Sequence, residues 1–442
     1  MTKRAIVIGA GPAGLAAASG LTARRVETLT LESDTPGGVA RTVRRDGWLA
    51  ECGPHSFRFQ DNRTPRLIVD TGLTGELVDA SPAAKKRFVT RDGVPVSPLR
   101  ALGLPGIARL AAEPFVASGG DDDESVAGYF RRRLGTRAYA RLGDAFVGGI
   151  HAGDPDKLSL VHAFPQLRRF ERDHGSLVRG LLATRAERRA GGRARIAAFR
   201  LGMSQLADTA AARLGDTLHT GARVTAIERT SGGWRVAWTG NDGLSRIESA
   251  DDVVVATPSH AWGTLGLPAA FDPLTQADRT PRYAPVAVVT LGFDRRRVAH
   301  PLDGFGLLTP SCERRVSLGI LFPSSVFPGR APHDGVSLAV FIGGARRPEL
   351  AALTATDLVA IARRECEQLL GATGAPEFVH TAVWSRGIPQ YERTGYGRFL
   401  ADLAEAETAH PGLHFTGNFR GGVSVVAAMD RADALAARLA GE

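Results

Sequence analysis

Cysteine is scarce in this chain, and long apolar runs are missing from it. The 442 residues contain three cysteines, which are far apart and form no Cys-x-x-Cys pair: Cys52, Cys312 and Cys366. This spacing disfavours a disulfide framework, a zinc site and a dithiol redox centre, so we expect no bound metal. No uncharged apolar run approaches the roughly 18–20 residues that cross a bilayer, and the N-terminus is patterned as a strand rather than a signal peptide. We therefore expect a cytoplasmic protein.

Lysine is nearly absent too, yet the chain carries a net charge of +9 because arginine is abundant. The basic residues are scattered, with three tight clusters at 85–87, 131–133 and 295–297. Aromatic residues make up 7% of the chain and are not interleaved with these clusters, so a nucleic-acid-binding surface is disfavoured. An acidic substrate or contact with anionic lipid at a membrane surface agrees with the charge.

The first thirty or so residues have the pattern of a dinucleotide-binding unit. RAIVIGAG predicts a strand, PAGLAAASGLTARR a helix, and VETLTLE a second strand. Gly9, Gly11 and Gly14 permit a tight turn and a close approach of backbone N–H groups to a pyrophosphate at the helix N-terminus. Glu32 ends the second strand, where it can accept hydrogen bonds from a ribose diol.

The residues after Glu32 narrow the choice of dinucleotide. Ser33 and Asp34 follow with no adjacent arginine for a 2′-phosphate, which disfavours NADP. No second strand–GxGxxG–helix unit occurs later, which argues against the plan of two-nucleotide disulfide reductases. FAD and NAD remain.

A glycine-rich segment from Pro36 to Phe57, PGGVARTVRRDGWLAECGPHSF, predicts irregular backbone passing close to a flat ligand. A plain surface loop with a hairpin is the alternative. The C-terminal region repeats the pattern: a strand over 413–416, a turn at Gly417-Asn418, a Gly421-Gly422 pair, and a helix from about Val423. The positive end of that helix would suit a flavin ring that becomes anionic on reduction.

These patterns predict an α/β protein with a discontinuous Rossmann-like FAD-binding domain formed by residues 1–75, 196–258 and 385–442. The inserted α+β substrate domain has an expected helical part over 76–195 and an expected sheet part over 259–384. The runs APVAVVTLGF, RRVSLGILF and GVSLAVFIGG predict antiparallel strands in the sheet part. ADDVVVATPSHAW predicts a buried strand that ends at Thr257, back in the nucleotide domain.

At this point the sequence resembles the flavin amine-oxidase superfamily and, within it, the protoporphyrinogen and coproporphyrinogen oxidase branch. The superfamily motifs are the GxGxxG unit with Glu32, Gly37-Gly38 through Thr42, Trp48 to Gly53, and Gly417-Asn418 with Gly422. The narrower motifs are KKRFVTRDG, EPFVASGGDDDESVAGYFRRRLG, DAFVGGIHAGDPDKLSL, FPQLRRFERDHGSLVRGL and GMSQL. The resemblance spans nearly the whole chain.

The resemblance implies non-covalent FAD and oxidation of a porphyrinogen, with O2 as acceptor and H2O2 as product. It implies that the flavin carries the chemistry without a catalytic side chain, and that Val224 meets the adenine side through its backbone. Because Val423-Ser424 stands where some relatives have a flavin-linking cysteine, no thioether is expected. The full set of expected cofactor contacts is Gly9, Gly11, Pro12, Ala13, Gly14, Glu32, Ser33, Gly37, Gly38, Arg41, Thr42, Gly53, Pro54, His55, Ser56, Val224, Thr257, Trp384, Gly417, Asn418, Gly422, Val423 and Ser424.

The few lysines disfavour the mechanism of amine oxidases that depends on a lysine-held water. Amine oxidases of this superfamily generally use a late lysine to hold a water over the flavin, whereas no lysine follows Lys157 here. In the porphyrinogen branch the flavin acts with little help from acid–base side chains, which agrees with this absence.

The expected substrate carries propionates, and an arginine after the RDG…P stretch usually meets one in this branch. Arg100 is the first candidate, Arg109 the second, and an exposed surface arginine is the alternative. His151 is expected to line the substrate cavity, although buried core histidines are common. The segment after Arg100 is short, and Asp144-Ala145 replaces a usual Glu-Pro.

These departures keep three hypotheses in view. The first is a porphyrinogen oxidase of haem synthesis, acting on coproporphyrinogen III or protoporphyrinogen IX. The second is a flavin oxidase or desaturase for a natural-product intermediate of secondary metabolism. The third is a non-catalytic FAD- or porphyrin-binding partner. A homodimer and peripheral contact with a membrane are compatible with each.

Overall fold

In the computed structural model, which describes residues 3–121, 123–190 and 194–442, the N-terminal strand lies in a five-stranded parallel sheet. The order β10-β2-β1-β14-β20 brings strands from the beginning, middle and end of the chain side by side. These strands are β1 (Arg4–Ile8), β2 (Glu27–Glu32), β10 (Leu218–Thr220), β14 (Asp252–Val255) and β20 (Leu413–Phe415).

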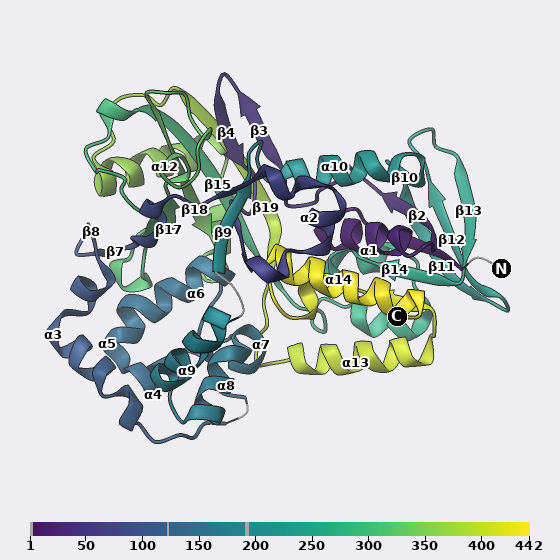
Figure 1. Ribbon diagram of the computed structural model, residues 1–442, viewed down its shortest axis with the longest axis horizontal. Helices are drawn as coiled ribbons and strands as arrows, with labels where there is room; N and C mark the ends of the chain where they lie inside the picture. Colours follow the sequence, from purple (N-terminus) through teal and green to yellow (C-terminus); the bar gives the residue numbers. More distant parts are fainter. Residues whose placement is uncertain (1–2, 122, 191–193) are drawn as a thin grey trace.

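Both faces of this sheet are covered, because successive residues of each strand point to opposite sides. Ala5 and Val7 face a core shared with four helices, and Ile6 and Ile8 face a second core. The helices on the first face are α1 (Pro12–Ala23), α2 (Arg66–Asp70), α10 (Ser204–Leu214) and α14 (Val425–Ala440) (Figure 1). The second face is covered by α13 (Tyr396–Ala409) and by the antiparallel strands β11 (Arg223–Thr230), β12 (Gly233–Thr239) and β13 (Ser245–Ala250).

A seven-stranded sheet forms the centre of the other lobe. Its order is β19-β15-β18-β17-β16-β7-β8, and its pairs are antiparallel except β16 with β7. Helix α12 (Ala355–Leu370) packs on one face. The strands are β7 (Phe88–Arg91), β8 (Val94–Val96), β15 (Tyr283–Asp294), β16 (Gly306–Leu308), β17 (Ser317–Leu321), β18 (Gly335–Gly343) and β19 (Phe378–Pro389).

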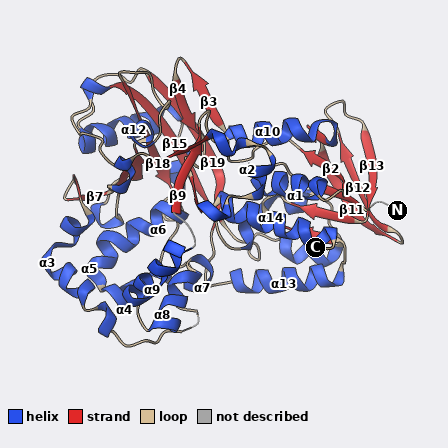
Figure 2. Ribbon diagram, in the orientation of Figure 1, coloured by secondary structure: helices blue, strands red, loops and turns tan. Residues whose placement is uncertain are grey.

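Seven helices cluster beside this sheet, and Figure 2 shows that the cluster contains no strand among its described residues. They are α3 (Pro98–Ala111), α4 (Val126–Leu134), α5 (Thr136–Ala138), α6 (Asp144–His151), α7 (Leu160–Ala163), α8 (Pro165–His174) and α9 (Leu177–Ala190). Helix α6 approaches the seven-stranded sheet closely, since a Cβ atom at Gly149 would lie 2.7 Å from the Leu308 side chain. We call this group of helices the helical subdomain.

Two small sheets and one short helix complete the α-helices and strands of the described residues. The hairpin β3–β4 joins Thr42–Arg45 to Trp48–Glu51, and Trp48 stacks on Phe378 of β19. The second sheet has the order β5-β9-β6, with β5 (Phe57–Gln60), β6 (Leu77–Asp79) and β9 (Ala194–Phe199). The short helix is α11 (Pro323–Val326). The hairpin connects the lobe built on the parallel sheet to the face of the large sheet opposite α12.

The expected fold class, a discontinuous Rossmann-like domain with an inserted α+β domain, is confirmed. The content of the parts differs in detail. The expected helical part, 76–195, also supplies β7 and β8 to the large sheet, because β7 finds its parallel partner β16 more than two hundred residues later. Strand β19 runs across the expected boundary at 384/385. Residues 1–2, 122 and 191–193, which fall within the expected parts and motifs, lie outside the described residues.

Candidate functional site

The turn between β1 and α1 is shaped by its three glycines. Gly9 has φ +99°, and its N–H donates to Leu31 of β2 at 2.8 Å. A Cβ atom at Gly14 would lie 1.8 Å from the Gly9 carbonyl oxygen, so only glycine allows α1 to start this close to the strand. Apart from Gly11 and its two chain neighbours, no described protein atom lies within 4 Å of the Cβ position of Gly11, the residue that precedes α1. The turn thus has room for a phosphate.

The first turn of α1 has backbone N–H groups that can donate hydrogen bonds to a phosphate at this turn. Pro12 occupies the first helical position, and Ala13 is buried behind it. No side chain caps this helix, and no acidic residue lies in its first turn. Free N–H groups and the positive end of the helix dipole together suit a pyrophosphate.

Glu32 braces this turn through its carboxylate. The Ala10 N–H donates to Glu32 Oε2 at 2.6 Å, and the Asp34 N–H donates to Oε1 at 2.9 Å. The Ser33 hydroxyl lies 3.4 Å from the same oxygen. Val224 is buried close by on β11, two residues after Ala222, whose N–H donates to the Glu32 carbonyl.

The glycine pair after β2 folds back onto the first turn. The Gly37 N–H donates to the Ala10 carbonyl at 2.8 Å, and a Cβ atom at Gly38 would lie 3.3 Å from Gly11 Cα. Arg41 donates to the Gly38 carbonyl and forms an ion pair with Asp34 at 2.7 Å. Two glycine-rich segments therefore meet at one place.

The hydroxyl group of Thr42 forms a hydrogen bond with a buried carboxyl group. It donates to Glu51 Oε2 at 2.6 Å and accepts the Ser204 N–H at 3.0 Å. Glu51 is 2% exposed, and burial raises the pKa of its carboxyl group to about 7. The Met203 N–H donates to the same carboxyl group at 3.0 Å, so Glu51 joins the hairpin to the start of α10. Contact of Thr42 with a cofactor would have to come from its backbone or methyl group.

The segment Gly53–Ser56 passes between the hairpin and β5. A Cβ atom at Gly53 would lie 2.3 Å from the Val39 carbonyl oxygen, so this backbone approach also requires glycine. Pro54 and Ser56 are half-buried. His55 is buried with its ring against Phe341 of β18, and burial lowers its pKa to about 4.

Trp384 links the large sheet to this segment. Its indole N–H donates to the Cys52 carbonyl at 2.6 Å, and the Arg41 guanidinium lies 5.9 Å from the indole ring centroid. Trp384 and Phe341 are both half-buried and lie on the face of the large sheet away from α12. The expected cofactor residues at 41, 53 and 384 are thus brought together from the two lobes.

The C-terminal glycine-rich loop closes the arrangement at the edge of the parallel sheet. Gly417 and Gly422 have φ +146° and +89°, conformations that favour glycine. Asn418 and Val423 are half-buried in the same loop. The Ser424 hydroxyl accepts the Ala427 N–H at 3.1 Å and caps α14, which therefore starts two residues later than expected.

Two threonines at this edge have buried hydroxyl groups without a partner among the described residues. Thr257 follows β14 and lies beside Gly9, and Thr416 follows β20. Sequence reasoning singled out Thr257 and missed Thr416, although the pattern of a strand followed by Thr-Gly could have indicated it.

The two expected substrate residues lie apart. Arg100 is exposed on the first turn of α3, and its side chain forms no hydrogen bond or ion pair within the described residues. His151 ends α6 and is 2% exposed, with its ring edge-on to Phe164 and Tyr391. Burial lowers the pKa of His151 to about 4, so it is neutral at pH 7. The structure shows a packed histidine there, and its contact with substrate stays a prediction.

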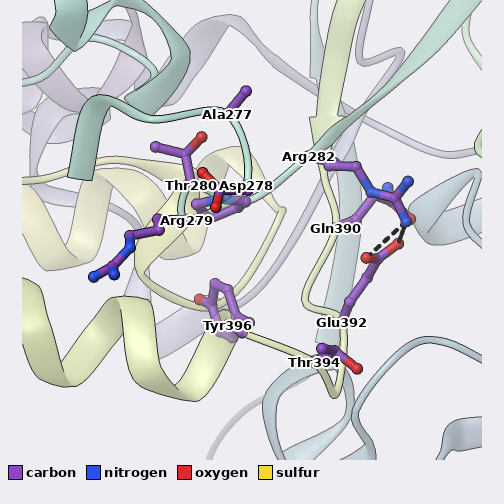
Figure 3. A pocket seen from close by; sticks show the side chains of 11 residues that line it. Ala277, Asp278, Arg279, Thr280, Arg282, Gln390, Glu392, Thr394 and Tyr396 are labelled. Carbon is purple, nitrogen blue, oxygen red and sulfur yellow. Dashed lines mark hydrogen bonds and ion pairs between the residues drawn. The ribbon is translucent and has the colours of Figure 1, made fainter. Parts of the chain in front are cut away.

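A pocket of about 240 Å³ lies between the segments 277–282 and 390–396. Figure 3 shows Arg282 and Glu392 paired at one side of it and Tyr396 at another. None of the expected cofactor residues lines this pocket. In the described part of the chain, no cluster of His, Cys, Asp and Glu could hold a metal ion, and no helix is long and apolar enough to cross a membrane.

Comparison with known proteins assigns the family. The flavin containing amine oxidoreductase family matches residues 12–438, and the chain belongs to this family. Protoporphyrinogen oxidase 2 of Arabidopsis thaliana is 30% identical over 96% of this chain and 91% of the plant protein. Coproporphyrinogen III oxidase of Bacillus subtilis (strain 168) is 28% identical over 98% of this chain and 97% of its own length.

A solved structure of similar shape supports the fold. A protoporphyrinogen oxidase candidate from Exiguobacterium sp. 255-15 superposes with a TM-score of 0.78 at 23% identity, over 99% of both chains. The protein is accordingly an FAD-dependent oxidoreductase. The open Cβ position at Gly11 and the uncapped N-terminus of α1 fit the phosphates of FAD.

Proposed function

We propose that this enzyme dehydrogenates a porphyrinogen, coproporphyrinogen III or protoporphyrinogen IX, to the porphyrin. The observation that carries the proposal is the similarity, over nearly the full length of both chains, to porphyrinogen oxidases of plants and bacteria. Bound FAD supplies the electron acceptor for a substrate whose ring methylene groups lose hydrogen. Each pair of electrons removed reduces one O2 to H2O2, and the protons accompany them.

The chain's own residues bind and orient in this proposal. The glycine turn and α1 hold the pyrophosphate, Glu32 the adenosine ribose, and the loop before α14 the flavin end. The face of the large sheet away from α12, where Phe341 and Trp384 are half-buried, would offer an apolar surface for a flat macrocycle. Arg100 is the proposed partner of a substrate propionate.

Aerobic assays of the FAD-loaded protein with each porphyrinogen test the proposal. Porphyrin fluorescence should rise faster than in the uncatalysed reaction, with H2O2 formed in proportion. The porphyrinogen that is oxidised faster is then identified as the substrate. Rates equal to autoxidation with both porphyrinogens would overturn it. Reduction of the bound flavin by a smaller natural product instead would favour the second hypothesis, an oxidase or desaturase of secondary metabolism.

A further inference from the structure

Two buried tyrosines hold neighbouring carbonyl groups of the segment 417–422, which we call the closing loop. The Tyr391 hydroxyl donates to the Asn418 carbonyl, and the Tyr396 hydroxyl donates to the Phe419 carbonyl at 2.7 Å. Arg431 of α14 donates to a third carbonyl of this loop, that of Gly421, at 2.6 Å. Side chains from outside the loop thus determine where its carbonyl groups point.

The tyrosine pair is rigidly supported. The two rings stack with centroids 4.6 Å apart, and Tyr391 and Tyr396 are 0% and 3% exposed. His151 and His162 of the helical subdomain pack edge-on against Tyr391 and Tyr396, respectively. Burial raises the pKa of both phenols, so both remain hydrogen-bond donors. Tyr396 also lines the pocket of Figure 3, whereas Tyr391 does not.

Because each peptide unit is planar and trans, fixing a carbonyl group of the closing loop also fixes the direction of the N–H group that follows it. In each peptide unit the C=O and the following N–H point in opposite directions. Turning the Asn418 carbonyl toward Tyr391 therefore turns the Phe419 N–H away from it, and the Gly421 carbonyl acts likewise on the Gly422 N–H. Neither amide has a hydrogen-bond partner among the described residues. Free backbone amides close together in a loop form a site for an anionic or carbonyl oxygen.

We propose that Tyr391 and Tyr396 are positioning residues for FAD. The Tyr391 hydroxyl fixes the peptide plane of the Phe419 amide, and Arg431 fixes that of the Gly422 amide, so that both amides donate to oxygen atoms of the cofactor. The Tyr396 hydroxyl fixes the peptide plane between them, whose Arg420 N–H donates to the Gly417 carbonyl at 3.3 Å and closes the turn that carries the Phe419 amide. The inference rests on the proposed placement of FAD against this loop. Neither tyrosine touches the cofactor in this arrangement; each acts through one backbone carbonyl.

The variants Tyr391→Phe and Tyr396→Phe remove one hydroxyl group each and preserve the stacked rings. Tyr129→Phe is the matched control, because Tyr129 is also 0% exposed and its hydroxyl donates to a backbone carbonyl, that of Leu167, within the helical subdomain. We expect each loop variant to raise the Kd of FAD about threefold to tenfold, the effect of one hydrogen bond. The Kd is measured by titrating apoprotein with FAD, and visible circular dichroism of the bound flavin reports its orientation.

A merely structural role would change only the melting temperature of the apoprotein, as in Tyr129→Phe. If both loop variants keep the wild-type Kd and the wild-type dichroism, the proposal is wrong. Should either tyrosine variant fail to fold, Arg431→Lys tests the same loop through the Gly421 carbonyl, with the same expected change in Kd. No porphyrinogen enters these measurements, so failure of the proposed activity and failure of this inference are distinguished.

Discussion

Gly14 of α1 rests on the carbonyl oxygen of Gly9 at the end of β1, where an added Cβ atom would come within 1.8 Å of that oxygen. Three residues before Gly14, the Cβ position of Gly11 is open. One glycine of the turn therefore serves packing of the fold, and the other keeps space at the proposed pyrophosphate site. This difference makes the two glycines experimentally separable.

Gly14→Ala should destabilise the protein itself, by about 1–3 kcal/mol, because α1 must move away from β1. Gly11→Ala should leave the free energy of unfolding of the apoprotein within about 0.5 kcal/mol of wild type, since Gly11 has φ −71° and no neighbour. It should nevertheless weaken FAD binding. Denaturant unfolding of the apoproteins and FAD titrations check both. Wild-type FAD affinity in Gly11→Ala would show that the pyrophosphate lies elsewhere.

Glu51 should make stability fall as pH rises from about 4.5 to about 7. Its pKa is raised by burial from 4.5 to about 7, so the folded state holds a proton that the unfolded state has already lost in this window. The effect amounts to at most about 3 kcal/mol. Comparing unfolding free energies of wild type and Glu51→Gln across pH 4–8 isolates it, because only wild type carries this dependence.

The matched control for this measurement is Glu365→Gln. Glu365 is buried like Glu51, but its carboxylate is paired with Arg315 and accepts from the Ser317 hydroxyl. A pH dependence for Glu51→Gln that parallels wild type would contradict the assignment of a raised pKa to Glu51.

His151 should have the opposite effect on the acid side. Burial lowers its pKa from 6.5 to about 4, so the unfolded state takes up a proton first, and stability is lost as pH falls through this range. His151→Phe should reduce the loss of unfolding free energy on acidification by up to about 3 kcal/mol at pH 4. Acid titration followed by circular dichroism measures it. An unchanged KM for the porphyrinogen would assign this residue to packing alone.

Arg100→Gln should raise KM for the porphyrinogen about tenfold and leave kcat nearly unchanged, as expected for loss of one charge-assisted hydrogen bond to a propionate. The control is Arg363→Gln, which changes an exposed arginine of α12. Equal KM values for the two variants would mean that another arginine meets the propionate.

Much of the local structure could be predicted because it depends on neighbours in the chain. The glycines of the first turn, the strand that precedes them and the helix that follows are specified by side chains a few residues apart. The antiparallel runs of the large sheet were predicted from their composition in the same way. Short strands could not be predicted from the sequence. Strand β10 has three residues, too few to show a periodicity, and β7 forms a strand because it pairs with the distant β16.

The glycine turn after β1 and the fold class thus follow from the order of residues alone, since steric and hydrogen-bonding limits act over a few residues there. Tertiary structure alone decided which distant groups meet. The Thr42 hydroxyl donates to the Glu51 carboxyl group, and the Trp384 indole N–H donates to the carbonyl of Cys52, 332 residues away. It also buried His151 and set Tyr391 and Tyr396 beneath the closing loop. Such pairings depend on how whole elements pack, because a side chain's partner is the group that burial leaves within reach.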